Sequence, residues 1–179
     1  MRIGISGAHG TGKTTLAEVV CAGLPGHVLE DEPYHLLEED GYEFGFPPSV
    51  DDYRAMLARS VRCLGTSSPD VVFDRTPVDY LAYLAALGRD PAGEVDAEVL
   101  RSVFASLDLL VVTVITPETE RTLPGAELPG LRSATNDALL DLVHADPLDA
   151  WPDVPVVELD GPLAGRAHVV LAAARHHRA

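Results

Sequence analysis

The apolar residues of this chain gather into five short runs, separated by longer segments of mixed polarity. The runs are residues 2–6, 27–30, 70–74, 109–115 and 154–159. Short continuous apolar runs are typical of strands that are buried on both faces, as in parallel sheets. The pattern therefore predicts a sheet of five parallel strands.

The segments between the runs have the periodicity of amphipathic helices. In residues 50–64, for example, Tyr53, Met56 and Leu57 lie on one apolar stripe, and Ser49 is the expected N-cap. Alternating strands and helices predict an α/β fold, a three-layer α/β/α sandwich with right-handed crossovers. Helices are predicted over 13–23, 50–64, 77–87, 94–106, 134–144 and 162–175.

Two segments rich in proline and glycine interrupt this pattern. They are residues 41–49 and 116–130. The second is too long to be a plain connection, and long structureless segments in compact domains are often functional. We therefore predict one domain spanning residues 1–179 with a lid at about 116–133.

The segment after the first run carries a phosphate-binding motif. Its sequence GAHGTGKTT, residues 7–15, fits the pattern G-x-x-x-x-G-K-[ST] and lies between a predicted strand and a predicted helix, as the motif requires. Its glycines let backbone N–H groups turn toward phosphate oxygens, and the helix N-terminus adds partial positive charge. We therefore expect a nucleotide to be bound by Gly7, Ala8, His9, Gly10, Thr11, Gly12, Lys13, Thr14 and Thr15.

Lys13 is the only lysine in the chain, which has twelve arginines. An ammonium group on a flexible stem reaches the β- and γ-phosphates as a point charge, and the planar guanidinium group of arginine is a poor replacement. We expect this side chain to be exposed and to contribute little packing, and Thr14 to offer its hydroxyl to Mg²⁺. The motif thus predicts a P-loop NTPase fold that binds ATP or GTP with Mg²⁺.

A carboxylate on a neighbouring strand is needed to complete such a magnesium site. Asp74 ends the third apolar run, at the sheet edge where α/β proteins place their ligands, and Arg75 follows it. We expect Asp74 to hold Mg²⁺ and Arg75 to act beside it. Asp79 is expected either to cap the following helix or to contact the substrate.

A second acidic cluster follows the second apolar run. Glu32 precedes Pro33, which holds it out of helical geometry, so its carboxylate is positioned to orient or deprotonate a substrate hydroxyl. Asp31 is the alternative residue for this role, and the choice between them stays open.

The predicted lid contains two arginines, Arg121 and Arg132. Either can close over a transferred phosphoryl group and stabilise its charge. We favour Arg132, because a glycine hinge and the start of a helix lie beside it.

The net charge of −15 arises from 28 acidic and 13 basic residues. A surface of this sign repels phosphate backbones and anionic lipids, so neither nucleic acid nor membrane is expected as a partner. Cys21 and Cys63 lie in predicted helices and are expected to be reduced. The chain starts without a long apolar segment, so we expect a cytoplasmic protein.

The order of these motifs resembles that of small P-loop kinases, namely nicotinamide riboside kinase-like P-loop ATPases and deoxyribonucleoside kinases. The resemblance rests on GAHGTGKTT, on DEPY at 31–34, on FDRTPVDYLAY at 73–83, and on a Pro/Gly-rich segment with an arginine. Two positions differ. Deoxyribonucleoside kinases have E-R-S where this chain has D-R-T at 74–76, and they follow the EP dipeptide with tryptophan, whereas the only tryptophan here is Trp151.

This resemblance implies a role for each matched residue. The nucleotide and Mg²⁺ are held by Lys13 and Thr14, with Asp74 as the second carboxylate ligand. Arg75 contacts the acceptor or the transferred phosphoryl group, and Glu32 is the base. The resemblance also places Arg132 in the lid and the turn at 160–166 beside the adenine, and it allows a homodimer.

The sequence therefore predicts an ATP-dependent kinase that phosphorylates a hydroxyl of a small metabolite, such as a nucleoside, a nucleotide or a natural product. The alternative is a regulatory ATPase or GTPase switch without a small-molecule acceptor, although no guanine-reading N-K-x-D sequence is visible. The predicted catalytic residues are Lys13, Glu32, Asp74, Arg75 and Arg132, and the predicted Mg²⁺ ligands are Thr14 and Asp74.

Overall fold

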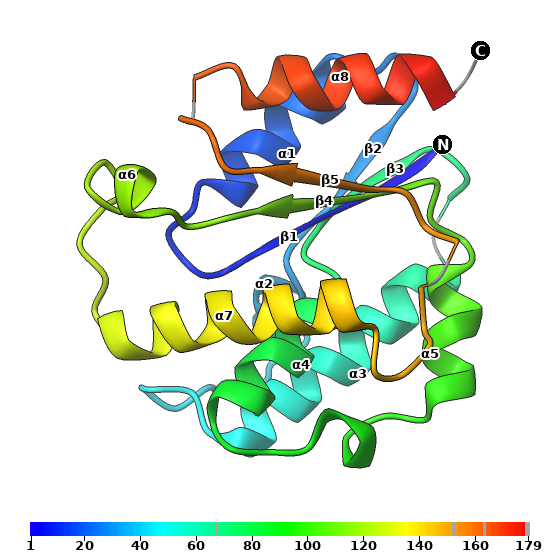
Figure 1. The fold of residues 1–179 in the computed structure, drawn as a ribbon. Coiled ribbons are helices and arrows are strands. Elements are labelled where there is room, and N and C mark those ends of the chain that lie inside the picture. Colours follow the sequence, from blue (N-terminus) through cyan, green and yellow to red (C-terminus); the bar gives the residue numbers. More distant parts are fainter. Residues whose placement is uncertain (67, 152, 163, 178–179) are drawn as a thin grey trace.

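The five predicted strands form one parallel sheet in the order β2-β3-β1-β4-β5 (Figure 1). The computed structural model describes residues 1–66, 68–151, 153–162 and 164–177. Each strand matches its apolar run to within two residues. The strands are β1 (Arg2–Gly7), β2 (Val28–Glu30), β3 (Val71–Asp74), β4 (Leu109–Thr113) and β5 (Val156–Leu159).

Helices cover both faces of this sheet, which confirms the predicted three-layer α/β/α sandwich (Figure 1). One face carries α1 (Lys13–Ala22) and α8 (Arg166–His177). The other face carries α3 (Val50–Thr66), α4 (Pro77–Ala86), α5 (Ala97–Phe104) and α7 (Pro129–Ala145). Shorter helical segments are α2 (Pro33–Glu39), α6 (Pro117–Glu120) and the 3₁₀ turn η1 (Pro91–Gly93).

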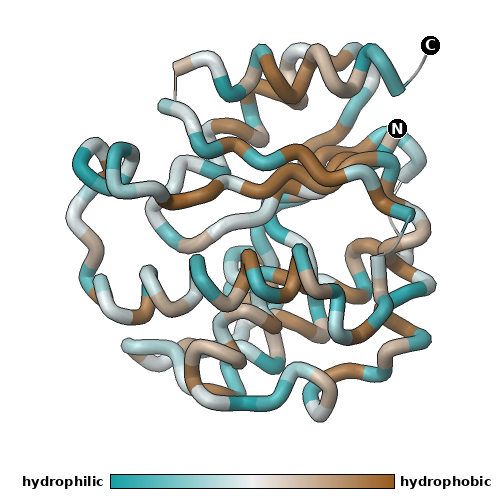
Figure 2. Tube along the Cα trace, viewed as in Figure 1, coloured by the Kyte–Doolittle hydropathy of each residue, from teal (hydrophilic) through white to brown (hydrophobic). Residues whose placement is uncertain are grey.

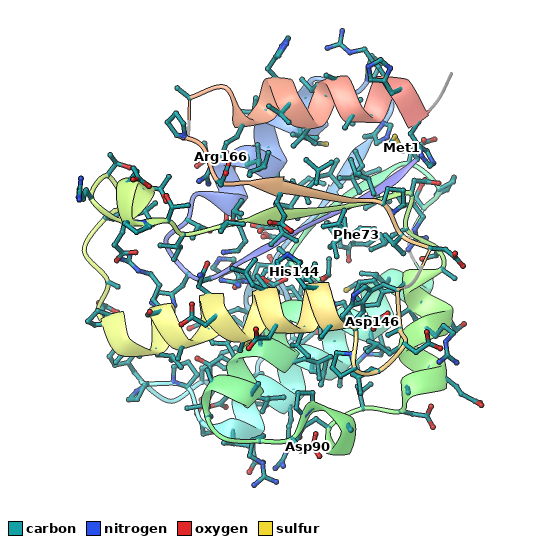
Figure 3. All side chains as sticks on the ribbon, viewed as in Figure 1. Met1, Phe73, Asp90, His144, Asp146 and Arg166 are labelled. Atoms are coloured by element: carbon teal, nitrogen blue, oxygen red, sulfur yellow. The ribbon has the colours of Figure 1, made fainter. Side chains whose placement is uncertain are left out.

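The alternation of side chains along each strand divides the core into two parts. Val72 and Val111 point into the cluster beneath α1 and α8. Their neighbours Phe73 and Val112 point into the larger cluster beneath α3, α4 and α7. In Figure 2 long stretches of the tube through the sheet are brown, the colour of hydrophobic residues, and Figure 3 shows Phe73 on the side of the sheet that faces α4 and α7. Both faces are therefore buried, which explains why the strands are continuous apolar runs.

The central position of β1 brings the predicted functional segments to one edge of the sheet. Ile5 is in register with Asp74 on β3, and Gly7 is in register with Thr113 on β4. Because all strands are parallel, their carboxyl ends meet at the edge from which the segment 7–15 leaves. The linker that carries α6 lies at the same edge (Figure 1).

Several helix predictions need correction at their boundaries. The helix expected over 134–144 begins five residues earlier, at Pro129, and α2 and α6 were not predicted. Proline is the first residue of all three, where its missing N–H costs nothing and its fixed φ favours a helix start. Leu163, which falls in the predicted helix 162–175, lies outside the described residues.

The expected N-cap of α3 is confirmed. The Oγ of Ser49 accepts the backbone N–H of Asp52 at 3.2 Å, and it donates to Oδ2 of the same aspartate at 2.8 Å. Cys21 and Cys63 are thiols that are not joined in a disulfide, as predicted. In the described parts of the chain, no helix combines the length and the apolar character needed to cross a membrane.

Candidate active site

The loop between β1 and α1 is a tight cradle of backbone groups. A Cβ at Gly7 would lie 1.9 Å from Oγ1 of Thr113, so only glycine fits at this close approach to β4. Gly12, the N-cap of α1, has φ 80°, in the left-handed region that glycine tolerates best. These two glycines of the motif are thus required by the loop geometry, which presents N–H groups at a helix N-terminus.

Threonine and arginine side chains fix the shape of this loop. The Oγ1 of Thr11 donates to the carbonyl of Ala8 at 2.9 Å and forms a 2.8 Å hydrogen bond with Oγ1 of Thr113. From the other side, Nη1 of Arg166 donates to the carbonyl of Thr11 at 3.0 Å. Figure 3 shows Arg166 at the start of α8, facing the sheet edge. The loop is therefore held in place from both β4 and α8.

Helix α4 holds the loop through two side chains one turn apart. The Oδ1 of Asp79 accepts the N–H of Gly7 at 2.9 Å, and Oδ2 accepts the N–H of Thr76 at 3.0 Å. Of the two roles considered for Asp79, the structure shows the cap. The hydroxyl of Tyr83 accepts the N–H of His9 at 3.1 Å. The spacing of four residues puts both side chains on one face of α4.

Lys13 lies inside the cradle, not on the surface as the sequence led us to expect. Its side chain is 4% exposed, because the loop wraps around it, and Nζ donates to the carbonyl of Ala8 at 2.8 Å. Burial, together with the charge of Arg75, lowers the pKa of Lys13 to about 8. An ammonium group in such surroundings gains stability from any anion that enters the loop.

Asp74 is buried at the end of β3, with the hydroxyl of Thr14 beside it. It is 1% exposed, and neither carboxylate oxygen accepts a hydrogen bond from any described residue. Burial raises the pKa of Asp74, although the neighbouring Thr14 hydroxyl partly offsets this effect. A desolvated carboxylate beside a hydroxyl supplies the hard oxygen ligands that Mg²⁺ prefers, so the residues present fit this metal ion.

Arg75 occupies a conformation that is costly for a residue with a side chain. Its φ is 78°, which typically costs on the order of 1–3 kcal/mol and persists where the surroundings enforce it. Its side chain is held by three groups: Nε donates to Glu32 at 2.5 Å, and Nη1 donates to the Gly7 carbonyl and to Asp79, both at 3.2 Å. The guanidinium group thereby links β2, the P-loop and α4.

Glu32 lies between the end of β2 and α2, with the extended backbone predicted from Pro33 (φ −57°, ψ 131°). Burial alone would raise the pKa of Glu32, but the charges of Arg75 and Lys13 outweigh it, so the net effect is a lowered pKa. Glu32 is therefore ionised at neutral pH. Asp31 is exposed to solvent, and its Oδ1 accepts the N–H of Glu32 at 2.7 Å.

Of the two arginines in the predicted lid, Arg132 is the one that lies beside the P-loop. It is 5% exposed, and a Cβ on Gly10 would lie 3.4 Å from its Nη1. Nη1 donates to the Pro124 carbonyl at 2.8 Å, and Nη2 forms an ion pair with Glu120. Arg121 is exposed. Arg132 lies in the first turn of α7, so the glycine before it, which we expected to be a hinge, is part of the helix.

A cavity of about 340 Å³ opens beside the P-loop. Its lining combines His9 and Gly10 of the loop with Glu32, with Arg75 and with the predicted lid segment 124–128. Five tyrosine and phenylalanine side chains complete it: Tyr34, Phe46, Tyr53, Tyr80 and Tyr83. The cavity is thus an apolar space with an ion pair and a phosphate-binding loop on its wall.

A second hollow of about 300 Å³ lies on the other side of the P-loop. It is lined by Gly12, Thr15 and Val19 together with Gly165 and Arg166 from the start of α8. Gly165 and Arg166 belong to the turn 160–166, which we expected from the sequence to lie beside the adenine. Leu163 of the turn lies outside the described residues.

The front of the P-loop is electropositive. Burial and the charges of Arg75, Lys13 and Arg132, in that order, lower the pKa of His9 to about 4. Its imidazole is consequently neutral at pH 7 and bonds the Tyr83 hydroxyl through Nδ1 at 3.2 Å. Arg75 and Arg132 are each paired with a carboxylate, whereas the ammonium group of Lys13 bonds a backbone carbonyl, so the charge of Lys13 favours an anion bound inside the loop.

Sequence reasoning missed the cavity and the residues that tie it to the loop. Tyr53 and Tyr83 stack with ring centroids 4.7 Å apart, although they come from α3 and α4. Arg166 lies 155 residues from the Thr11 carbonyl that it contacts. Only the i, i+4 spacing of Asp79 and Tyr83 on α4 offered a signal in the sequence.

Comparison with solved structures supports the same architecture. Deoxyadenosine kinase from M. mycoides matches with a TM-score of 0.64 and 15% identity, over 98% of this chain and 99% of that chain. NadR in complex with NAD and AMP-PNP matches with a TM-score of 0.66 and 22% identity, over 98% of this chain and 49% of NadR. Thymidylate kinase from Candida albicans matches with a TM-score of 0.59 and 14% identity, over 98% of this chain and 92% of that chain. At these identities the likeness establishes the fold.

The family comparison agrees with the loop geometry. No curated protein matches the chain in sequence. A family model described as an AAA domain matches residues 2–145, which include the P-loop, Asp74 and Arg132. The chain therefore belongs to the AAA domain family and is a P-loop nucleotide-binding domain.

Proposed function

We propose that this protein is a kinase that transfers the γ-phosphoryl group of ATP to a hydroxyl group of a small molecule bound in the aromatic cavity. The observation that supports this most is the composition of the cavity wall, where the P-loop and the ion pair of Glu32 and Arg75 meet. An acceptor in the cavity therefore lies within reach of both a phosphate site and a carboxylate.

The phosphates of the nucleotide are held by the P-loop. Backbone N–H groups of residues 7–15 and the ammonium group of Lys13 contact the β- and γ-phosphates, as the motif requires. The hollow lined by Thr15, Val19 and Arg166 is on the side of the loop away from the acceptor cavity and takes the nucleobase. Donor and acceptor thus approach the loop from opposite sides.

Thr14 and Asp74 would hold Mg²⁺, because Asp74 offers two buried carboxylate oxygens that no described residue satisfies. When bound, Mg²⁺ would neutralise part of the negative charge on the phosphate oxygens. Arg75 and Arg132 supply further positive charge from the side of the cavity and of the lid.

Glu32 orients the acceptor hydroxyl and takes its proton. Arg75 engages Oε1, which leaves Oε2 to accept the hydroxyl hydrogen. As the acceptor oxygen bonds to the γ-phosphorus, the bond from this phosphorus to the bridging oxygen breaks, ADP departs, and the proton moves to Glu32. Glu32 is preferred to Asp31 for this role because Glu32 lines the cavity.

Acceptor-dependent consumption of ATP tests the proposal. We expect at least one of a panel of nucleosides, nucleotides, sugars and natural-product alcohols to stimulate ADP release. Glu32→Gln should lower kcat by about 10²–10⁴, while MgATP still binds. If the protein is instead a regulatory ATPase switch, no acceptor stimulates turnover and Glu32→Gln leaves the nucleotide response unchanged.

A further inference from the structure

The charges on one wall of the cavity are already compensated. Arg75 contacts two carboxylates, Glu32 at 2.5 Å and Asp79 at 3.2 Å. Its single positive charge is therefore matched by two negative ones before any acceptor enters. An anionic group placed beside this arginine would meet Glu32 at close range, and like charges at short distance disfavour binding.

The part of the lining formed by Arg132 and the predicted lid has the same character. Arg132 forms an ion pair with Glu120, and Glu127 from the lid lines the cavity as a further carboxylate. The remaining titratable base on the lining, His9, is neutral because burial and nearby cations lower its pKa to about 4. Among the described residues, the cavity thus offers no uncompensated cation to a phosphate group of an acceptor.

One polar group on the lining has no partner. Tyr80 is 1% exposed, lies on the cavity wall, and its hydroxyl makes no hydrogen bond with any described residue. Buried hydroxyl groups are almost always hydrogen-bonded, and an unpaired one is destabilising. A polar atom of a bound acceptor would satisfy this hydroxyl.

The other walls are apolar and favour a ring. Tyr53 and Tyr83 stack with an interplanar angle of 12°, and Phe46 and Met56 also line the cavity. Aromatic faces of this kind bind planar or cyclic groups well but offer no attraction to an anionic group.

We infer that the acceptor is a ring-bearing alcohol without a negative charge, and that Tyr80 is the residue that selects it by a hydrogen bond to a polar atom of its ring. The inference rests on the proposed function and narrows it. Phosphorylated acceptors, such as nucleoside monophosphates or phosphorylated vitamins, are excluded by Glu32 and Glu127.

Matched pairs of alcohols test the charge requirement. Thymidine, deoxyadenosine and pyridoxine are each compared with their own monophosphate. Binding is measured on the protein loaded with Mg²⁺ and a non-hydrolysable ATP analogue, and turnover is measured with ATP. We expect the uncharged member of at least one pair to bind about tenfold or more tightly than its monophosphate. Glu127→Lys should narrow this ratio, whereas Glu118→Lys, in the lid but off the cavity wall, should not.

Tyr80→Phe tests the selecting hydroxyl. We expect the acceptor affinity and kcat/KM to fall about tenfold, with unchanged affinity for MgATP. Thermal stability should not fall, because the removed hydroxyl bonds none of the described residues. Tyr42→Phe is the matched control. The hydroxyl of Tyr42 donates to Asp52 at 2.9 Å away from the cavity, so this variant should lose stability and keep its acceptor affinity.

The outcomes separate the inference from the proposed function. Tighter binding or faster turnover of the monophosphates overturns the inference and leaves the kinase proposal in place. A Tyr80→Phe variant that binds the acceptor normally, or that is destabilised like Tyr42→Phe, overturns the role of Tyr80. Preferential binding of the uncharged members without any turnover contradicts the kinase proposal alone, and failure of every pair to bind contradicts both.

Discussion

The Nε of Arg75 lies 2.5 Å from Oε1 of Glu32, so the residue that follows β3 is joined to the loop that follows β2. In this position the backbone of Arg75 has a left-handed conformation, with φ 78°. The same guanidinium group contacts the carbonyl of Gly7 at 3.2 Å. The carboxylate that we propose as the base is thereby fixed relative to the phosphate-binding loop.

Removal of Arg75 should change the pH dependence of the reaction. Its charge lowers the pKa of Glu32 against the effect of burial, so in Arg75→Gln the pKa of Glu32 should rise. A base acts when deprotonated, so activity should be lost as the pH falls through the pKa of Glu32, at higher pH in the variant. The pH profile of kcat/KM measures this. An acid limb at the same pH in both proteins would show that Glu32 is not the titrating base.

Nucleotide affinity should depend on the protonation of Lys13. Its pKa of about 8 means that the free protein loses this positive charge as the pH rises through 8, so the affinity for MgATP should fall over the same range. Calorimetry in buffers of different ionisation enthalpy should detect proton uptake on binding. In Lys13→Arg the guanidinium stays charged, so the affinity should be lower at pH 7 but independent of pH up to 9.

The fold should survive loss of the Lys13 side chain. Lys13→Ala should abolish measurable activity, because the β- and γ-phosphates lose their point charge. The buried ammonium group donates to the Ala8 carbonyl and is disfavoured by burial, so the circular dichroism spectrum and the cooperative unfolding of the variant should be retained. A near wild-type rate in this variant would contradict the nucleotide site.

Asp74→Asn should separate stability from function. The raised pKa of Asp74 shows that folding disfavours its charged form, so this residue costs stability as the pH rises through that pKa. The neutral variant should unfold with a free energy higher by about 1 kcal/mol at pH 7 without nucleotide. Stabilisation by Mg²⁺ with ATP, measured as a shift in Tm, should disappear. A variant that is destabilised and keeps this shift would rule out Asp74 as a ligand.

Arg132 and Arg121 should differ in their effect on turnover. Arg132 is buried beside Gly10, so Arg132→Gln should lower kcat about 10³-fold with a smaller change in the KM for ATP. Arg121 is exposed, and Arg121→Gln should stay within about twofold of the wild type. Steady-state kinetics of the two variants decide between the arginines, and equal losses would refute the proposed role of Arg132.

The features that the sequence predicted are those with local signatures. The five buried strands and the motif at 7–15 are specified by contiguous residues, so pattern and spacing located them. The early start of α7 was hidden because Leu128, Pro129 and Gly130 have the composition of a loop. Proline at the first helical position and burial of Arg132 against Glu120 stabilise this turn.

The remaining features depend on contacts between distant segments. Three such features follow from the assembled fold: the left-handed backbone of Arg75, the burial of Lys13, and a Tyr80 hydroxyl that bonds no residue in the described part of the chain. The periodicity of the sequence could not predict these features. The aromatic cavity likewise takes its walls from α2, α3, α4 and the predicted lid segment 124–128, whose side-chain directions emerge only when the layers pack.

The fate of the γ-phosphoryl group tests the central claim most directly. The protein is incubated with Mg²⁺, [γ-³²P]ATP and an acceptor that binds the cavity, and the labelled products are identified for the wild type and for Glu32→Gln. We predict that the wild type places the label on a hydroxyl of the acceptor and that Glu32→Gln does so at least about a hundredfold more slowly while binding MgATP equally well. Label that appears only in inorganic phosphate, at equal rates in both proteins, would contradict the account.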